Sequence, residues 1–198
     1  MKKFFALSAF VVLLILAWHA ASAAAAAFNW PAATRTDTST YAFAPNSAVV
    51  VEDSSGDVQI TGWDKPNVSL TVQRSALNSR DFDRMTVSAT DAGGALRVLA
   101  QIPSQCFDCD VSLQLSVPRS AHITIVTASG DVTTGSLAGP VRAQTDSGDI
   151  SVSDVGGAVH VQSSSGDITL ARCAAAVGAA TSSGDIAATD LASDADLA

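Results

Sequence analysis

The chain has 198 residues, of which 47% are hydrophobic, so it is long enough and apolar enough to form one domain with a buried core, and disorder is not expected. Its 11 basic residues are outnumbered by 19 acidic ones, a formal net charge of −8. This balance argues against sequence-independent binding of nucleic acid and against electrostatic adsorption to an anionic membrane, whereas cations or basic ligands would be attracted.

Residues 1–23 have the features of a secretory signal peptide. Lys2 and Lys3 precede an apolar run over residues 4–18, and Ala21-Ser22-Ala23 fits the small-residue pattern of a cleavage site. We expect cleavage within residues 23–27 and export to the periplasm, the cell envelope or the medium. The alternative is an uncleaved membrane anchor, because the apolar run and the following alanines approach the roughly 20 residues of a membrane span. Membrane contact is expected only through this segment, and only if it is not cleaved.

Residues 24–47 are predicted to be a linker or an irregular lead-in, since they contain Pro31, Pro45 and many Ala, Thr and Ser residues. A β-strand-repeat domain is expected over residues 48–198. It opens with alternating apolar residues around Ser54-Ser55-Gly56-Asp57, and further alternating stretches indicate strands up to residue 126. We expect these strands to form β coils or hairpins that are less regular than the C-terminal part.

Cys106 and Cys109 form a C-x-x-C pair between two predicted strands. They fit a local disulfide in an oxidising compartment, a redox couple or half of a metal site. No second C-x-x-C or histidine pair completes a zinc set, and a thioredoxin-like βαβ pattern is absent from the sequence. The disulfide is the preferred interpretation.

Four segments of equal length fill residues 127–198, and Ser129, Ser147, Ser165 and Ser183 open their Ser-Gly-Asp turns at intervals of 18 residues. Each segment has two runs of apolar residues with a period of two, which predicts two strands with one buried face each. A fixed period with identical inward positions favours coils stacked in parallel over hairpins. The sequence therefore predicts an all-β, solenoid-like stack with 18-residue repeats, in which Cys173 is a small core residue.

The Ser-Gly-Asp turns have both a structural and a functional interpretation. Glycine allows the positive φ of a sharp corner, and Ser and Asp can bond to backbone groups of the turn. Stacking would also align four carboxylates, those of Asp131, Asp149, Asp167 and Asp185, which calcium could bridge. We prefer the structural interpretation, because the nonapeptide of calcium-binding β-rolls is not matched.

The V-V-V-E-D-S-S-G-D-V opening, the L-Q-L-S-V-P-R strand and the serial S-G-D-[VI] turns resemble the bacterial "putative adhesin" family of β-strand-repeat domains, a domain of unknown function. The resemblance covers roughly residues 49–198. It implies a solenoid-like β fold at the cell envelope and no established catalytic residues. Cys106 and Cys109 are not part of the shared motif.

Three functions follow as hypotheses. The first is an exported noncatalytic scaffold or adhesion module that binds an envelope protein or surface polymer, and the second is a cation-binding β-roll. The third is an exported redox protein that uses the C-x-x-C pair; hydrolytic catalysis is not expected, since His122 and His160 match no motif with a nucleophile. The last repeat could also pair end to end with another copy, although its aspartates would discourage this.

Overall fold

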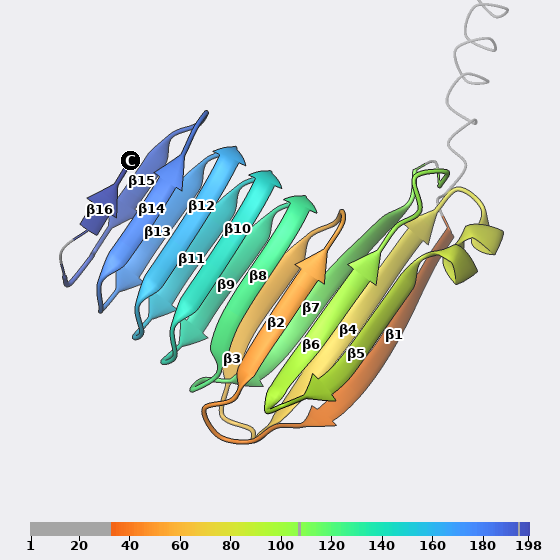
Figure 1. Ribbon diagram of the computed structural model, residues 1–198, viewed down its shortest axis with the longest axis horizontal. Coiled ribbons are helices and arrows are strands. Elements are labelled where there is room, and N and C mark those ends of the chain that lie inside the picture. The colour runs from red at the N-terminus through yellow and green to blue at the C-terminus, as the bar shows by residue number, and fades with distance from the viewer. Residues whose placement is uncertain (1–32, 107, 194) are drawn as a thin grey trace, which may run out of the picture. The chain divides into compact units, whose positions relative to one another are not determined.

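The computed structural model describes residues 33–106, 108–193 and 195–198, and its strands form two eight-stranded sheets that face each other across the core (Figure 1). The predicted signal peptide and cleavage region lie outside the described residues. In the part that is described, no helix has the length and hydropathy to cross a membrane.

The two sheets have the following strands in spatial order. Sheet A consists of β1 (Ala33–Ala42), β4 (Asn67–Ala76), β7 (Asp110–Pro118), β3 (Val58–Trp63), β9 (Val132–Leu137), β11 (Ile150–Val155), β13 (Ile168–Cys173) and β15 (Ile186–Thr189). Sheet B consists of β16 (Ala195–Leu197), β14 (Val177–Thr181), β12 (Val159–Ser165), β10 (Val141–Ser147), β8 (His122–Ser129), β2 (Ala48–Asp53), β6 (Ala95–Gln101) and β5 (Thr86–Ala92). A short 3-10 helix, η1 (Ser79–Arg84), lies between β4 and β5.

From β8 onward the chain winds as a regular stack of coils, each with one strand in sheet B and the next in sheet A (Figure 1). Neighbouring coils pair in parallel, and each residue lies beside the residue 18 positions later, as in Val141 beside Val159 and Ile150 beside Ile168. The prediction of an all-β, solenoid-like stack is confirmed. In the first three segments the predicted inward side chains form the core, and full burial of a Val, Leu or Ile side chain stabilises the fold by about 1.5–3 kcal/mol. In the last segment the prediction is wrong for the second strand: Ala195 and Leu197 are exposed on β16, the edge strand of sheet B.

Cys173 is fully buried at the end of β13, where the sequence predicted a small core residue. Its thiol lies 3.8 Å from the carbonyl oxygen of Ala171, and burial raises the pKa of this thiol above its usual value. Cys173 therefore behaves as part of the core.

The first coil, β2 and β3, stacks directly on β8 and β9 although 74 residues separate Asp53 from its partner Thr127. The intervening residues do not lie between the first coil and the β8–β9 coil. They lie on the other side of the first coil, where β6 and β7 pair with the opposite edges of β2 and β3. Beyond them, β4 and β5 pair antiparallel with β7 and β6. This region combines parallel coils with antiparallel hairpins, as the expectation of a less regular part implied.

Strand β1 differs from the expectation of a linker or irregular lead-in over residues 24–47. It pairs antiparallel with β4 along its whole length, from Ala33 beside Ala76 to Ala42 beside Asn67, and Arg74 donates to Asp37 at 2.6 Å. The strand lies at the edge of sheet A and most of its side chains are exposed, so it needs no alternation of apolar residues. Its threonines suit an extended strand, but their polarity resembles that of a linker.

Candidate functional site

Five Ser-Gly-Asp corners connect sheet B to sheet A, and the φ angles of their glycines lie between +125° and +150°. The positive φ expected at these positions is therefore present. The corners also stack closely: a β-carbon on Gly148 would collide with the carbonyl oxygen of Gly130, and one on Gly166 with that of Gly148. Glycine is required at each corner by its own conformation and by the coil beside it.

The turn aspartates form a ladder of hydrogen bonds between coils. In each case an Oδ1 atom accepts the backbone N–H of the aspartate in the next coil: Asp57 from Asp131 (3.0 Å), Asp131 from Asp149 (2.9 Å), Asp149 from Asp167 (2.8 Å) and Asp167 from Asp185 (2.8 Å). The capping expected of these aspartates thus extends between turns rather than within one. It accounts for their recurrence structurally, and calcium binding by the ladder stays a prediction.

Sequence reasoning missed the special conformation of the opposite corner, where sheet A returns to sheet B. Ser136, Asp154, Arg172 and Asp190 have φ angles of 53° to 60°, a left-handed conformation that aspartate adopts more readily than most residues. The recurrence of Asp at this position was the available signal. Arg172 forms a bidentate contact with Asp154 at 2.6 and 2.8 Å, which lowers the pKa of Asp154 and raises that of Arg172.

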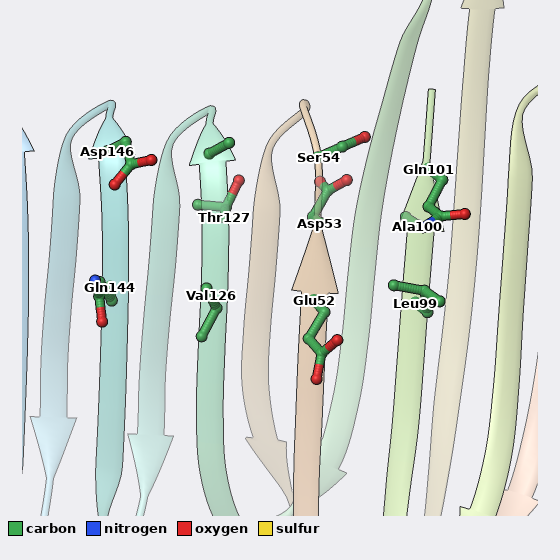
Figure 2. A pocket seen from close by; sticks show the side chains of 11 residues that line it. Glu52, Asp53, Ser54, Leu99, Ala100, Gln101, Val126, Thr127, Gln144 and Asp146 are labelled. Atoms are coloured by element: carbon green, nitrogen blue, oxygen red, sulfur yellow. The ribbon is translucent and has the colours of Figure 1, made fainter. Parts of the chain in front are cut away.

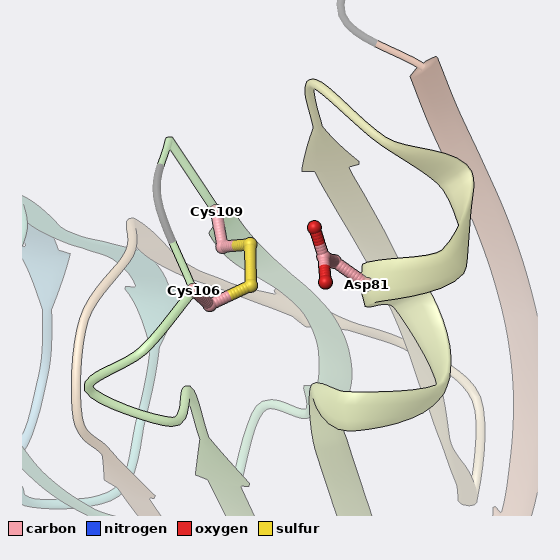
Figure 3. Close-up of side chains that lie close together, drawn as sticks. All are labelled: Asp81, Cys106 and Cys109. Carbon is pink, nitrogen blue, oxygen red and sulfur yellow. A yellow bond between two sulfur atoms is a disulfide. The ribbon is translucent and has the colours of Figure 1, made fainter.

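The loop over residues 102–109 connects β6 to β7 and occupies the place of a Ser-Gly-Asp corner in the coil beside β2 and β3. Cys106 and Cys109 are joined in it by a disulfide, with their Cα atoms 5.6 Å apart (Figure 3). The amide of Cys106 donates to the carbonyl of Pro103 at 2.9 Å, and the amide of Ile102 donates to Ser54 Oγ at 3.0 Å. The cysteine pair therefore belongs to an enlarged corner that is anchored to the first coil.

The outer face of sheet B carries a shallow hollow of about 550 Å³ across β6, β2, β8 and β10 (Figure 2). It is lined by Glu52, Asp53, Ser54, Leu99, Ala100, Gln101, Val126, Thr127, Ala128, Gln144 and Asp146. Leu99 and Val126 are 37% and 44% exposed, which is unusual for such side chains on a sheet whose other face forms the core. Small side chains at Ser54 and Ala128 leave room above them. The hollow thus has an apolar floor open to solvent.

Acidic side chains border this apolar floor. Glu52 lies between Leu99 and Val126 in the register of the sheet and is paired with Arg97 at 3.1 Å. Asp146 is exposed at the other side, and no basic side chain of the described residues forms an ion pair with it. The hollow offers a ligand apolar contact and at least one unneutralised carboxylate.

Asp53 lines the end of the hollow and has an unusual environment. Later coils have Thr127, Thr145 and Ser163 at the equivalent position, and the Thr127 and Thr145 hydroxyls donate to corner carbonyls at 3.1 Å. Asp53 is 6% exposed; its Oδ1 accepts the N–H of Ser55 at 3.2 Å, while Oδ2 is buried without a hydrogen-bond partner. Burial raises the pKa of Asp53 to about 6, and the nearby carboxylates of Asp110 and Asp57 add to this.

His122 and His160 are exposed on β8 and β12. Among the described residues neither histidine donates to or accepts from a serine or a carboxylate, so the arrangement offers no nucleophile paired with a base.

Comparison with known proteins supports the same architecture. A family model described as Toastrack DUF4097, a domain of unknown function, matches residues 46–196. A "putative cell adhesion protein" of solved structure from Clostridium sporogenes is 10% identical, with a TM-score of 0.52 over 82% of this chain and 98% of that one. No curated protein matches the chain significantly.

Two further solved structures are less similar in geometry. A "putative adhesin" from Bacteroides fragilis is 12% identical with a TM-score of 0.36, over 83% of this chain and 97% of that one. A "putative lipid binding protein" from Parabacteroides distasonis is 12% identical with a TM-score of 0.31, over the same shares of the two chains. At these identities the likeness concerns the fold alone.

Proposed function

The chain belongs to the Toastrack DUF4097 family, and on that premise we propose that it is a noncatalytic interaction module of the bacterial cell envelope whose partner binds the hollow on the outer face of sheet B. The observation that carries this proposal is the exposure of Leu99 and Val126 beside acidic side chains on the outer face of sheet B. Apolar contacts exposed at the surface of a folded domain are typical of binding sites.

The charge of the site favours a basic partner. Without the predicted leader, nine basic residues face 19 acidic ones, a formal charge of −10, and Asp146 has no neutralising side chain near it in the described part. A segment with an aliphatic or aromatic side chain next to Lys or Arg would cover Leu99 and Val126 and pair with Asp146. Such a segment would also be steered to the site by the net charge.

An envelope location is supported by two independent features. The N-terminal 23 residues have the pattern of a secretory signal peptide, and the Clostridium structure of the same fold is described as a "putative cell adhesion protein". We infer that the partner is an exported protein with a basic, partly apolar segment. A surface polymer is the alternative that the experiment distinguishes.

Photocrosslinking in the cells that express the protein tests the proposal. A benzophenone amino acid at position 126 should produce a discrete crosslinked band, and the same group at Thr169, an exposed residue on the outer face of sheet A, should not. A discrete band that survives glycosidase treatment unchanged identifies a protein partner, whereas a band that glycosidase shifts or removes identifies a surface polymer. Equal yields from both positions, or no adduct from position 126, would overturn the assignment of the hollow.

A pair of variants then separates binding from folding. Replacing both Leu99 and Val126 by serine should abolish the adduct of a crosslinker placed at Gln144 with only a modest fall in the melting temperature, because both side chains are partly exposed. The matched control is Thr133→Ser on the exposed face of β9, which should change neither quantity. Retention of the adduct in the double variant would contradict the proposal.

A further inference from the structure

The disulfide loop lies beside η1, and the two elements bring together three side chains of metal-binding type. The Sγ atoms of Cys106 and Cys109 and a carboxylate oxygen of Asp81 all lie within 4.8 Å of one another, and the three residues are partly buried (Figure 3). This is the one such group of three that the described residues form. The binding surface on sheet B uses none of these residues.

We propose that reduction of the Cys106–Cys109 disulfide converts this group into a binding site for a thiophilic divalent cation such as Zn²⁺, with two thiolates and the Asp81 carboxylate as ligands. In the oxidised form both sulfur atoms are engaged in the S–S bond and no thiolate exists to bind the ion. Whether the site can bind the cation therefore depends on whether the Cys106–Cys109 disulfide is reduced.

The redox step needs a dithiol reductant, such as the active site of a thiol–disulfide oxidoreductase. The reductant supplies two electrons and two protons, the S–S bond breaks, two thiols form, and the reductant becomes a disulfide. Binding of the cation then displaces the two thiol protons to solvent. Reoxidation needs a disulfide oxidant, which accepts the two electrons and, with two protons from solvent, becomes a dithiol while the Cys106–Cys109 bond re-forms and the ion is released.

The donor set fits the chemistry of zinc. Cysteine sulfurs three positions apart match the C-x-x-C half of many zinc sites, and aspartate oxygen is an established zinc ligand. Two thiolates and one carboxylate carry three negative charges, and the nearby Arg84 guanidinium carries one positive charge. A divalent cation would balance the remainder, with water completing a tetrahedral shell.

Arg84 positions the carboxylate relative to the loop. Its Nη1 atom lies 3.3 Å from Asp81 Oδ1, and its Nη2 donates to Gln105 Oε1 at 3.4 Å, so one side chain joins η1 to the residue before Cys106. The helix itself is fixed at its start, where Asn78 accepts from Arg80 and from the amide of Asp81. The third ligand is thus held beside the sulfurs before any ion arrives.

Cobalt titration of the purified protein without an affinity tag tests the proposal. After reduction with a phosphine, one equivalent of Co²⁺ should produce a near-ultraviolet charge-transfer band from thiolate ligands, and Zn²⁺ should displace it. The oxidised protein should give no band. Cys173 is fully buried and should not contribute, which native thiol labelling checks by counting two accessible thiols after reduction and none before.

Two aspartate variants separate a ligand from a neighbour. Asp81→Asn should weaken Co²⁺ binding by about tenfold or more, while Asp83→Asn, on the same helix but 89% exposed, should leave it unchanged. Asp81→Glu, which keeps a carboxylate, should retain most of the affinity if the asparagine variant proves unstable. Circular dichroism would confirm that each variant is folded.

Three results would overturn the proposal. The first is the absence of a band in the reduced protein, and the second is an equal band in a protein with Cys106→Ser and Cys109→Ser. The third is equal weakening by Asp81→Asn and Asp83→Asn, which would remove Asp81 from the ligand set.

Discussion

The regular coils from β8 to β15 and the region from β1 to β7 differ in how they form the corners between the two sheets and in how their strands pair. In the regular coils every corner from sheet B to sheet A is a Ser-Gly-Asp turn, and the turn aspartates Asp131, Asp149 and Asp167 each cap the next coil. The last inward position before each turn is Thr or Ser. In the first region one corner is a disulfide loop, the equivalent of Thr127 is Asp53, and the outermost strands pair antiparallel.

Because of this difference, one part of the chain has mainly structural residues and the other has several residues that could bind a ligand. Repetition in the regular coils gives the recurring corner and core residues structural roles, although Thr134 Oγ1 is buried without a hydrogen-bond partner among the described residues. The first region contains the buried unpaired carboxylate of Asp53, the disulfide beside Asp81, and half of the strands under the apolar hollow. We therefore expect substitutions at the corners of the regular coils to act on folding, and substitutions at Leu99, Asp81 and the cysteine pair of the first region to act on binding.

The largest effect should come from Gly148→Ala in a regular corner. The new β-carbon would meet the carbonyl of Gly130 at a φ of +136°, so we expect a loss of about 3 kcal/mol or more in the free energy of unfolding. Gly94→Ala, in the β5–β6 hairpin, has a φ of +85° but no atom within 4 Å of the added carbon, and should cost about 1–2 kcal/mol. Urea unfolding measures both, and equal losses would contradict the role of stacking.

Asp53→Thr should make the first coil resemble the regular ones and stabilise the protein. Removing a buried unpaired oxygen and adding the hydroxyl bond seen at Thr127 should raise the free energy of unfolding by about 1–2 kcal/mol at pH 7.

The pH dependence of this gain follows from the raised pKa. The pKa of Asp53 is 3.8 when unperturbed and about 6 in the folded protein, so the folded state retains its proton longer. In the wild type, the loss of stability caused by ionising the buried Asp53 is absent below about pH 4, grows between pH 4 and pH 6, and is complete above about pH 6. Unfolding at pH 7 and pH 4 should show the advantage of Asp53→Thr shrinking in acid, and a constant advantage would rule out titration of Asp53 as its cause.

Asp149→Ala tests the ladder between coils. Loss of the acceptor for the Asp167 amide, 2.8 Å away, should cost about 1 kcal/mol. Asp185→Ala is the matched control, because no amide of the described residues bonds to that carboxylate. Thermal melting should separate the two variants, and addition of millimolar calcium should shift neither the wild type nor Asp149→Ala if the ladder acts only through amides.

The smallest effect should come from the exposed pair of Arg172 and Asp154. Arg172→Asn removes the ion pair but suits the left-handed corner, so the melting temperature should hardly change, while the pKa of Asp154 returns toward its usual value in a carboxyl titration by NMR. In the first region Arg74, whose side chain is only 13% exposed, pairs with Asp37, and Arg74→Gln should destabilise more. The opposite order would contradict the role of burial in these pairs.

The stack, its inward columns and the glycine corners were predictable because they recur at a fixed interval. Four copies of one pattern reveal which positions are buried, and the core position of Cys173 followed from its column alone. Strand β1 was not predictable in this way, because an exposed edge strand of Thr and Ser has no apolar period.

The candidate site was harder to foresee for a geometric reason. Leu99 and Val126 are ordinary strand residues in the sequence, and only the pairing of β6 with β2 and of β2 with β8 places them on one face around Glu52. Asp81 likewise meets the cysteines through packing of a short helix against a loop. Such neighbours depend on long-range register, which a local pattern does not contain.

The junction between the first coil and β8 also governs the order in which the chain folds. Pairing within the regular stack closes intervals of 18 residues, whereas joining β2 to β8 closes an interval of 74, which costs about 1.3 kcal/mol more in chain entropy. Strands β2 and β3 emerge before β8 and β9 during synthesis or export, so the edge that they share with β8 and β9 can form only after those strands have emerged. The hollow on sheet B spans this junction, so we expect it to form only after β8 and β10 have joined the first coil.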